Sequence, residues 1–207
     1  DTNRFLEVAV ARGWSSSRDL IGYYNPLNRI FEPAPTGMFD VIKILDQEAE
    51  SYESNPPIWV LLDEANLSPV EHYWSNFLAL ADTRKNTMKL GENYQVTDAL
   101  RFIATVNMDS TTEPLSDRLL DRAHVILVEP ENVIMTETSD EELYDCLAPL
   151  SYKILNEYFG SPQSNSCEFT DAEKEVFKNI QDILQDESKG GRPSIISPRT
   201  QQSILYY

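Results

Sequence analysis

Short apolar runs that alternate with amphipathic segments constrain the fold of this chain more than any other feature. The runs Phe5 to Val10, Ile58 to Leu62 and Arg101 to Val106 are rich in Val, Ile, Leu or Phe and have the length of buried strands. Between them, Gly37 to Tyr52 and Pro69 to Ala81 carry apolar residues at helical spacing. This alternation predicts a mostly parallel sheet covered by helices on both faces.

Two polar segments interrupt the alternation and have the pattern of hairpins. The first runs from Ile21 to Pro33 with its turn near Pro26 to Asn28, and the second runs from Met88 to Ala99 with Gly91 to Asn93 at its tip. We expect both hairpins to project from the sheet. A fourth strand is expected at His124 to Val128, where four apolar residues follow one another.

The pattern becomes helical after Pro130. Thr170 and Glu173 form a capping box ahead of an apolar stripe, and acidic residues open an earlier helix. The expected helices are Asp140 to Phe159, Thr170 to Gln185, and one that begins at Ser197. With 207 residues, the chain can form one domain and a smaller second one. We therefore predict an α/β core over residues 1–130 and a helical subdomain over residues 131–207.

The charge balance limits the partners of this domain. The formal net charge is −17, and a surface of that sign repels the phosphate backbone of nucleic acids. A broad DNA-binding face is therefore not expected here. If the parent protein binds DNA, we expect other domains or a local pore loop to make the contact.

Composition also indicates the compartment. Cys146 and Cys167 form no CxxC pair, and with two His residues in the chain they cannot assemble a zinc site. Reduced thiols of a cytoplasmic protein are the simpler interpretation. The longest apolar runs are the length of strands, and the first residues lack the pattern of a signal peptide. We expect no membrane segment.

The strongest chemical signal is a pair of carboxylates at the end of a buried strand. The run from Ile58 delivers Asp63 and Glu64 at its carboxyl end, where open α/β sheets bind their ligands. In a site that hydrolyses nucleotides, the first carboxylate helps to hold Mg²⁺ and the second accepts a proton from water. A turn that follows directly can aim both at one site. The alternative is an ordinary acidic turn before a helix that begins at Ser68.

A second signal is the amide of Asn107, which follows the next strand along the chain. If the two strands are neighbours, this amide lies beside Glu64, where it can orient water or touch a terminal phosphate. Asn is also a common turn former, so the position alone does not separate the two interpretations.

Three arginines complete the candidate set. Arg118 and Arg122 are four residues apart on an expected short helix and therefore share one face, which suits a phosphate reached across a subunit boundary. Local pairing with Asp117, Asp121 or Glu113 is the alternative. Arg199 lies in a Ser-Pro-Arg sequence that opens the last expected helix, where an ordinary first turn is the alternative.

In this order and on these elements, the features together resemble the AAA+ family, and more narrowly its McrB-like and MoxR-like branches. The resemblance covers nearly the whole chain. Its motifs are Trp14 to Pro26, Val60 to Tyr73, Thr105 to Thr112 and Leu115 to Ala123. The resemblance implies a P-loop NTPase-like parallel sheet flanked by helices, with a C-terminal α-helical lid over residues 131–207.

The resemblance also implies roles for the candidate residues. Asp63, the Mg²⁺ carboxylate, and Glu64, the catalytic base, correspond to the Walker B pair, and Asn107 corresponds to sensor 1. Arg122, with Arg118 as a second candidate, corresponds to the arginine finger, and Arg199 to sensor 2. The cofactors implied are ATP or GTP with Mg²⁺. Subunits of this kind assemble into a ring, expected to be hexameric.

One motif of the family is missing from these residues. None of the seven Gly residues precedes a Lys, so the Gly-Lys-Ser or Gly-Lys-Thr loop that cradles phosphates is not present. We expect that loop upstream of Asp1, with a strand that lies between those of Asn107 and Val125 in the family. Without that strand two apolar edges are exposed, so we expect either an upstream piece or a rearranged sheet, and no activity from the 207 residues alone.

The resemblance leaves alternatives for substrate and partner. GTP-using restriction motors carry Asn-x-x-Asp at sensor 1, whereas a single residue separates Asn107 from Asp109 here, which favours ATP. The parent protein is expected to drive a McrC-like nuclease, to act as a MoxR-like chaperone, or to be a catalytically silent scaffold. Retention of both carboxylates and both arginines argues against the scaffold.

Overall fold

The computed structural model describes residues 4–83, 86–107, 111–128, 148–159, 169–185 and 201. The chain divides into two compact units. The first consists of Asp1–Ser116 with Val125–Glu157, and the second of Asp117–His124 with Tyr158–Tyr207. The expected boundary at residue 130 stays a prediction.

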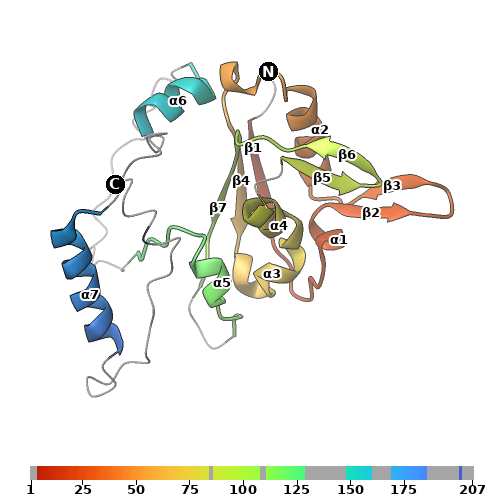
Figure 1. Ribbon diagram of the computed structural model, residues 1–207. Helices are drawn as coiled ribbons and strands as arrows, with labels where there is room; N and C mark the ends of the chain where they lie inside the picture. The colour runs from red at the N-terminus through yellow and green to blue at the C-terminus, as the bar shows by residue number, and fades with distance from the viewer. Residues whose placement is uncertain are drawn as a thin grey trace, which may run out of the picture. The chain divides into compact units, whose positions relative to one another are not determined.

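A three-stranded parallel sheet forms the centre of the first unit (Figure 1). Its strands are β1 (Phe5–Ala9), β4 (Ile58–Asp63) and β7 (Leu100–Ala104), in the order β1-β4-β7. All three are close to the apolar runs predicted as strands. The prediction of a mixed α/β fold with a parallel sheet flanked by helices is confirmed at this level.

The segments around Gly37 and Trp74 pack on one face of the sheet. Leu6, Val60 and Phe102 are paired in register, so their side chains share a face. On that face, a Cβ added to Gly37, which begins α2 (Met38–Gln47), would lie 3.2 Å from the Leu6 side chain. The Trp74 ring packs edge-on against Phe102, with 5.1 Å between the ring centroids. The core of the unit therefore lies on the Val60 side.

The opposite face of the sheet carries exposed apolar side chains. Phe5 and Trp59 share that face and are 45% and 39% exposed, and Ile103 is 48% exposed. A helix contact on this face comes from Tyr152 of α6 (Tyr152–Phe159), whose ring centroid lies 5.4 Å from the Arg101 guanidinium. The expected cover of helices is therefore incomplete on this face in the described ranges.

The sequence pattern accounts for α2, whereas a kink divides the helix that was predicted after β4. Met38, Val41, Ile42 and Leu45 are buried at helical spacing. The predicted helix over Pro69 to Ala81 is split into α3 (Val70–Tyr73) and α4 (Ser75–Thr83) at Trp74, whose φ of −97° and ψ of 8° leave the helical region.

Both predicted hairpins are present, and they pack on one another through aromatic rings. The first consists of β2 (Gly22–Asn25) and β3 (Ile30–Pro33), preceded by α1 (Ser17–Leu20). The second consists of β5 (Thr87–Leu90) and β6 (Glu92–Gln95). Phe39 of α2 lies between them, with centroids 4.3 Å from Phe31 and 5.6 Å from Tyr94.

Two sequence predictions in the later part of the chain are wrong. His124 to Val128 is not a strand, and its four apolar residues are 61% to 85% exposed. A strand needs a ladder partner, and the described residues supply none for this run. The helix predicted from Asp140 is α6 (Tyr152–Phe159), because residues 148–151 are not helical. The first part of that prediction lies outside the described residues.

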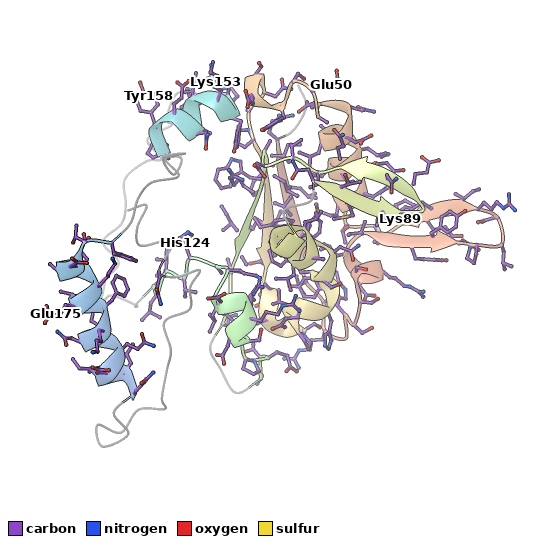
Figure 2. The ribbon with its side chains drawn as sticks, viewed as in Figure 1. Glu50, Lys89, His124, Lys153, Tyr158 and Glu175 are labelled. Atoms are coloured by element: carbon purple, nitrogen blue, oxygen red, sulfur yellow. The ribbon has the colours of Figure 1, made fainter. Side chains whose placement is uncertain are left out.

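The second unit contains short α5 (Asp117–Leu120) and α7 (Asp171–Gln185). The predicted capping box is present, since the Glu173 backbone donates to Thr170 Oγ1 at 3.3 Å and Thr170 donates to Glu173 Oε2 at 2.7 Å. Side chains such as Glu175 project from α7 (Figure 2), and its apolar stripe, which includes Val176 and Ile183, is exposed. Of the helix predicted from Ser197, only Gln201 is described. None of the helices described is long and apolar enough to span a membrane.

Candidate functional site

The second of two adjacent acidic residues at the end of β4 has a left-handed backbone conformation. Glu64 follows the last strand residue and has φ 51° and ψ 45°. This conformation costs a residue with a Cβ about 1–2 kcal/mol, so neighbouring bonds must hold it. The Glu64 N–H donates to Thr105 Oγ1 at 2.8 Å, and the Ala65 N–H donates to the Thr105 carbonyl at 2.9 Å. The turn is thereby tied to the end of β7.

Thr105 joins the two acidic residues. Its hydroxyl accepts from the Glu64 N–H and donates its own proton to Asp63 Oδ1 at 2.7 Å. The parallel register explains the contact, because Leu62 pairs with Ala104 and the residues that follow these two in the chain are Asp63 and Thr105. Sequence reasoning missed Thr105, although a polar residue one step before the strand end was a signal once the register was known.

Asn107 lies beside Glu64. Its Nδ2 donates to Glu64 Oε1 at 3.4 Å, a long bond that leaves both groups able to take other partners. Both side chains are exposed. The structure therefore brings Asp63, Glu64 and Asn107 together at the carboxyl ends of adjacent parallel strands.

A buried amide lies directly behind this group. Asn66 is 4% exposed and follows the carboxylate pair within a short 3₁₀ helix, Ala65–Leu67. Its side chain bonds to the backbone of Asn107 in both directions. Sequence reasoning missed Asn66 as well, because spacing does not reveal whether an amide in a turn is buried.

Two of the arginine candidates belong to a different unit of the chain from the carboxylates. Arg118 and Arg122 belong to the second unit, where Arg122 Nη1 donates to the Arg118 carbonyl at 2.5 Å. The short helix predicted to carry both arginines is α5, which ends at Leu120, so Arg118 is helical and Arg122 lies in the turn that follows. Arg199 and Asp109 lie outside the described residues.

The chemistry of Asp63 fits Mg²⁺. The half-buried carboxylate uses Oδ1 for the Thr105 hydroxyl, and Mg²⁺ is commonly held by one or two carboxylates together with water and phosphate oxygens. Within the described ranges, no three His, Cys, Asp or Glu side chains form a cluster that could hold a metal ion. A hydrated ion held through the Asp63 carboxylate needs no such cluster.

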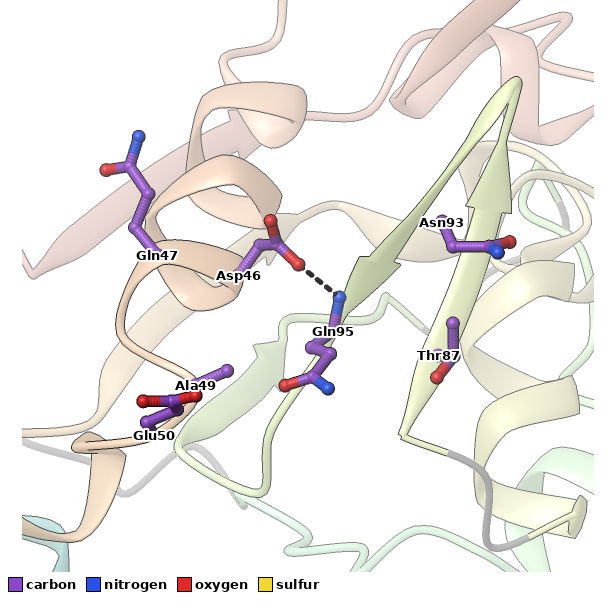
Figure 3. Close-up of a pocket in the computed structure, with 7 residues that line it drawn as sticks. All are labelled: Asp46, Gln47, Ala49, Glu50, Thr87, Asn93 and Gln95. Carbon is purple, nitrogen blue, oxygen red and sulfur yellow. Dashed lines mark hydrogen bonds between the residues drawn. The ribbon is translucent and has the colours of Figure 1, made fainter.

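A separate open cavity lies between the end of α2 and the β5–β6 hairpin (Figure 3). Its volume is about 610 Å³, and Asp46 Oδ1 accepts from the Gln95 backbone N–H at 2.7 Å beside it. The other lining residues are Gln47, Ala49, Glu50, Thr87 and Asn93. None of the candidate catalytic residues lines it.

Comparison with known proteins leaves the family open. No protein-family model matches the chain, and no curated protein matches it. Among solved structures, the chain is similar to a provisionally assigned ATPase from Cytophaga hutchinsonii, with 21% identity and a TM-score of 0.35. The match covers 60% of this chain, and the chain spans about a third (34%) of that protein. A likeness this low carries no argument about function.

Proposed function

We propose that this chain is part of a nucleotide-hydrolysing motor domain of the AAA+ type, which converts ATP or GTP to the diphosphate and phosphate. The observation that supports the proposal is the convergence of Asp63, Glu64 and Asn107 at the ends of adjacent parallel strands. Ligands of open α/β sheets bind at that edge.

Hydrolysis proceeds by in-line attack of water on the terminal phosphorus. The Glu64 carboxylate accepts the proton of the attacking water, and the bond to the bridging oxygen of the diphosphate breaks. Asn107 orients the water or contacts the terminal phosphate, because its amide donates toward Glu64. Asp63 would hold Mg²⁺, which would supply charge neutralisation at the phosphates.

The groups that cradle the phosphates are proposed to come from a segment outside these 207 residues. Such a segment would cover two apolar surfaces: the partly exposed sheet face with Phe5, Trp59 and Ile103, and the exposed run from Val125 to Val128. We propose that it carries the Gly-Lys loop and adds a strand beside β7.

The ring and its partners follow from the same proposal. Each site takes Asp63, Glu64, Asn107 and Arg199 from one subunit and Arg122, with Arg118 as the second candidate, from its neighbour in a hexamer. The two projecting hairpins contact the substrate. The parent protein drives a McrC-like nuclease in the cytoplasm, and remodelling of proteins by a MoxR-like chaperone is the alternative within the family.

Hydrolysis and assembly of the full-length protein test the proposal. We expect Mg²⁺-dependent release of phosphate from ATP, with GTP used less well, and nucleotide-dependent formation of a ring in light scattering. A full-length chain without a Gly-Lys-Ser or Gly-Lys-Thr loop, and without turnover of either nucleotide, would instead support a silent scaffold.

A further inference from the structure

We infer that Asn66 is a positioning residue that sets the catalytic rate by fixing the backbone of Asn107. The inference rests on the proposed function. It concerns a side chain that touches none of the reacting groups and acts through Asn107.

The Asn66 side-chain amide bonds to both the N–H and the carbonyl of Asn107. Its Oδ1 accepts from the Asn107 N–H at 3.1 Å, and its Nδ2 donates to the Asn107 carbonyl at 2.7 Å. The same Nδ2 donates to the Glu113 carbonyl at 3.1 Å. Both donors of the buried amide are used on backbone carbonyls, and its oxygen accepts one backbone N–H.

The following segment of the chain is tied to the same point. The Glu113 N–H donates to the Asn66 carbonyl at 2.8 Å, and the Thr112 hydroxyl donates to the Asn107 carbonyl at 2.7 Å. Asn66 therefore joins the turn after β4 to the end of β7 and to the residues that precede Arg118 in sequence.

This arrangement matters because Asn107 lies beyond the last residue of β7, Ala104. The sheet ladder does not hold its backbone, whereas the Asn66 side chain does. The contact from Asn107 to Glu64 is 3.4 Å long, so a small backbone displacement removes it. Misplacement of a catalytic group by about 1 Å lowers a rate roughly 100-fold.

Asn66→Asp tests the role with little change in shape. The carboxylate keeps an acceptor for the Asn107 N–H but faces the Asn107 and Glu113 carbonyls with an oxygen instead of a donor. In the full-length protein we expect kcat to fall about 10- to 100-fold while KM for ATP stays within about threefold. Asn86→Asp, at an exposed position, adds the same charge and should leave both constants unchanged.

A double-variant cycle separates positioning from a general structural effect. If Asn66 acts through Asn107, adding Asn66→Asp to Asn107→Ala should lower kcat by less than about twofold further. If the kcat losses of the two single variants multiply in the double variant, the inference is overturned. A kcat of Asn66→Asp equal to that of the unmodified protein would overturn it as well. Absence of hydrolysis by the unmodified protein would overturn the proposed function and, with it, this role.

Amide hydrogen exchange supplies a measurement that needs no variant. If Asn66→Asp does not fold, the Asn107 amide of the unmodified protein should still exchange at least about tenfold more slowly than the same amide in an unstructured peptide. If the Asn107 amide exchanges as fast as in an unstructured peptide, its bond to Asn66 Oδ1 is not maintained and the inference is overturned.

Discussion

The Thr105 hydroxyl is a single oxygen that bonds to both acidic residues of the site. Thr105→Val keeps the shape of the side chain and removes both bonds, so we expect hydrolysis to fall at least about tenfold, equivalent to roughly 1.4 kcal/mol in the barrier. The free energy of unfolding should fall by only about 0.5–1.5 kcal/mol, because the position is exposed. Steady-state phosphate release by the full-length protein measures the effect.

Thr105→Ser is the matched control, since it keeps the hydroxyl and removes a methyl group. Its hydrolysis should stay within about threefold of the unmodified rate, which is roughly 0.6 kcal/mol. Equal losses in the Val and Ser variants would show that the hydroxyl does not organise the carboxylates.

Tyr73 bonds to the turn that carries Asp63 and Glu64. Its side chain is fully buried, and its hydroxyl donates to the Ala65 carbonyl at 2.9 Å. Burial, and secondarily the nearby Glu71, raise the pKa of the Tyr73 hydroxyl well above its ordinary value of 10.0. Because the unfolded chain releases the proton first, this group stabilises the fold fully below pH 10.0 and progressively less above it.

Tyr73→Phe should lower the free energy of unfolding at pH 8 by about 1–2 kcal/mol, because the Ala65 carbonyl loses the bond from the Tyr73 hydroxyl. Chemical unfolding at pH 8 and pH 11 measures the difference. Between these values the unmodified protein should lose about 1 kcal/mol more than the Phe variant, since the slope for one such group approaches about 1.4 kcal/mol per pH unit. A pH dependence shared by both proteins would contradict the assignment.

At the scale of elements, the two hairpins meet at a glycine. Gly91 in the β5–β6 turn has φ +84°, and a Cβ there would lie 2.4 Å from the Tyr24 ring of β2. The added methyl group of Gly91→Ala should thus push the Tyr24 ring away from the turn, and the alanine should also strain the turn backbone. We expect a loss of about 2–4 kcal/mol in the free energy of unfolding.

Gly13→Ala is a control for the backbone strain alone. Gly13 has φ +89°, and an added Cβ would meet nothing within 4 Å. Its cost should be about 1–2 kcal/mol. Equal losses in the two variants, measured by chemical unfolding, would show that the hairpins do not depend on the contact at Gly91.

The elements also show what the sequence could predict. Continuous apolar runs placed β1, β4 and β7 within a residue or two, because a strand in a parallel sheet needs apolar side chains along its length. The same signal failed at Val125 to Val128, since an apolar run does not say whether a partner strand is present. The break at Trp74 was not visible because both sides of it keep helical spacing.

The candidate site was predictable in part for the same reason. Asp63, Glu64 and Asn107 follow strand ends, and strand ends can be read from the sequence. Thr105 and Asn66 depend on the register between β4 and β7 and on the left-handed turn at Glu64, which follow from tertiary structure. Their partners are mostly backbone groups, which spacing does not identify.

At the scale of the whole molecule, the proposed site is shared between subunits. Glu64→Gln and Arg122→Ala should each inactivate a ring, because one removes the base and the other the arginine reached from the neighbour. In an equal mixture of the two variants, about a quarter of the sites should combine an intact Glu64 with an intact neighbouring Arg122. Hydrolysis by the mixture should therefore exceed that of either variant alone.

Separately assembled rings that are not allowed to exchange subunits provide the control for this mixing experiment, and they should stay inactive. A mixture that remains inactive after exchange would place the Arg122 contribution within its own subunit or remove it from the site.

The most direct measurement of the central claim is nucleotide binding and turnover by the full-length Glu64→Gln variant. The account predicts ATP binding within a few-fold of the unmodified protein and a loss of hydrolysis of about 100- to 10,000-fold, because the amide replaces the proton acceptor while Asp63 remains. Undiminished hydrolysis by this variant would contradict the role of the carboxylates at the end of β4.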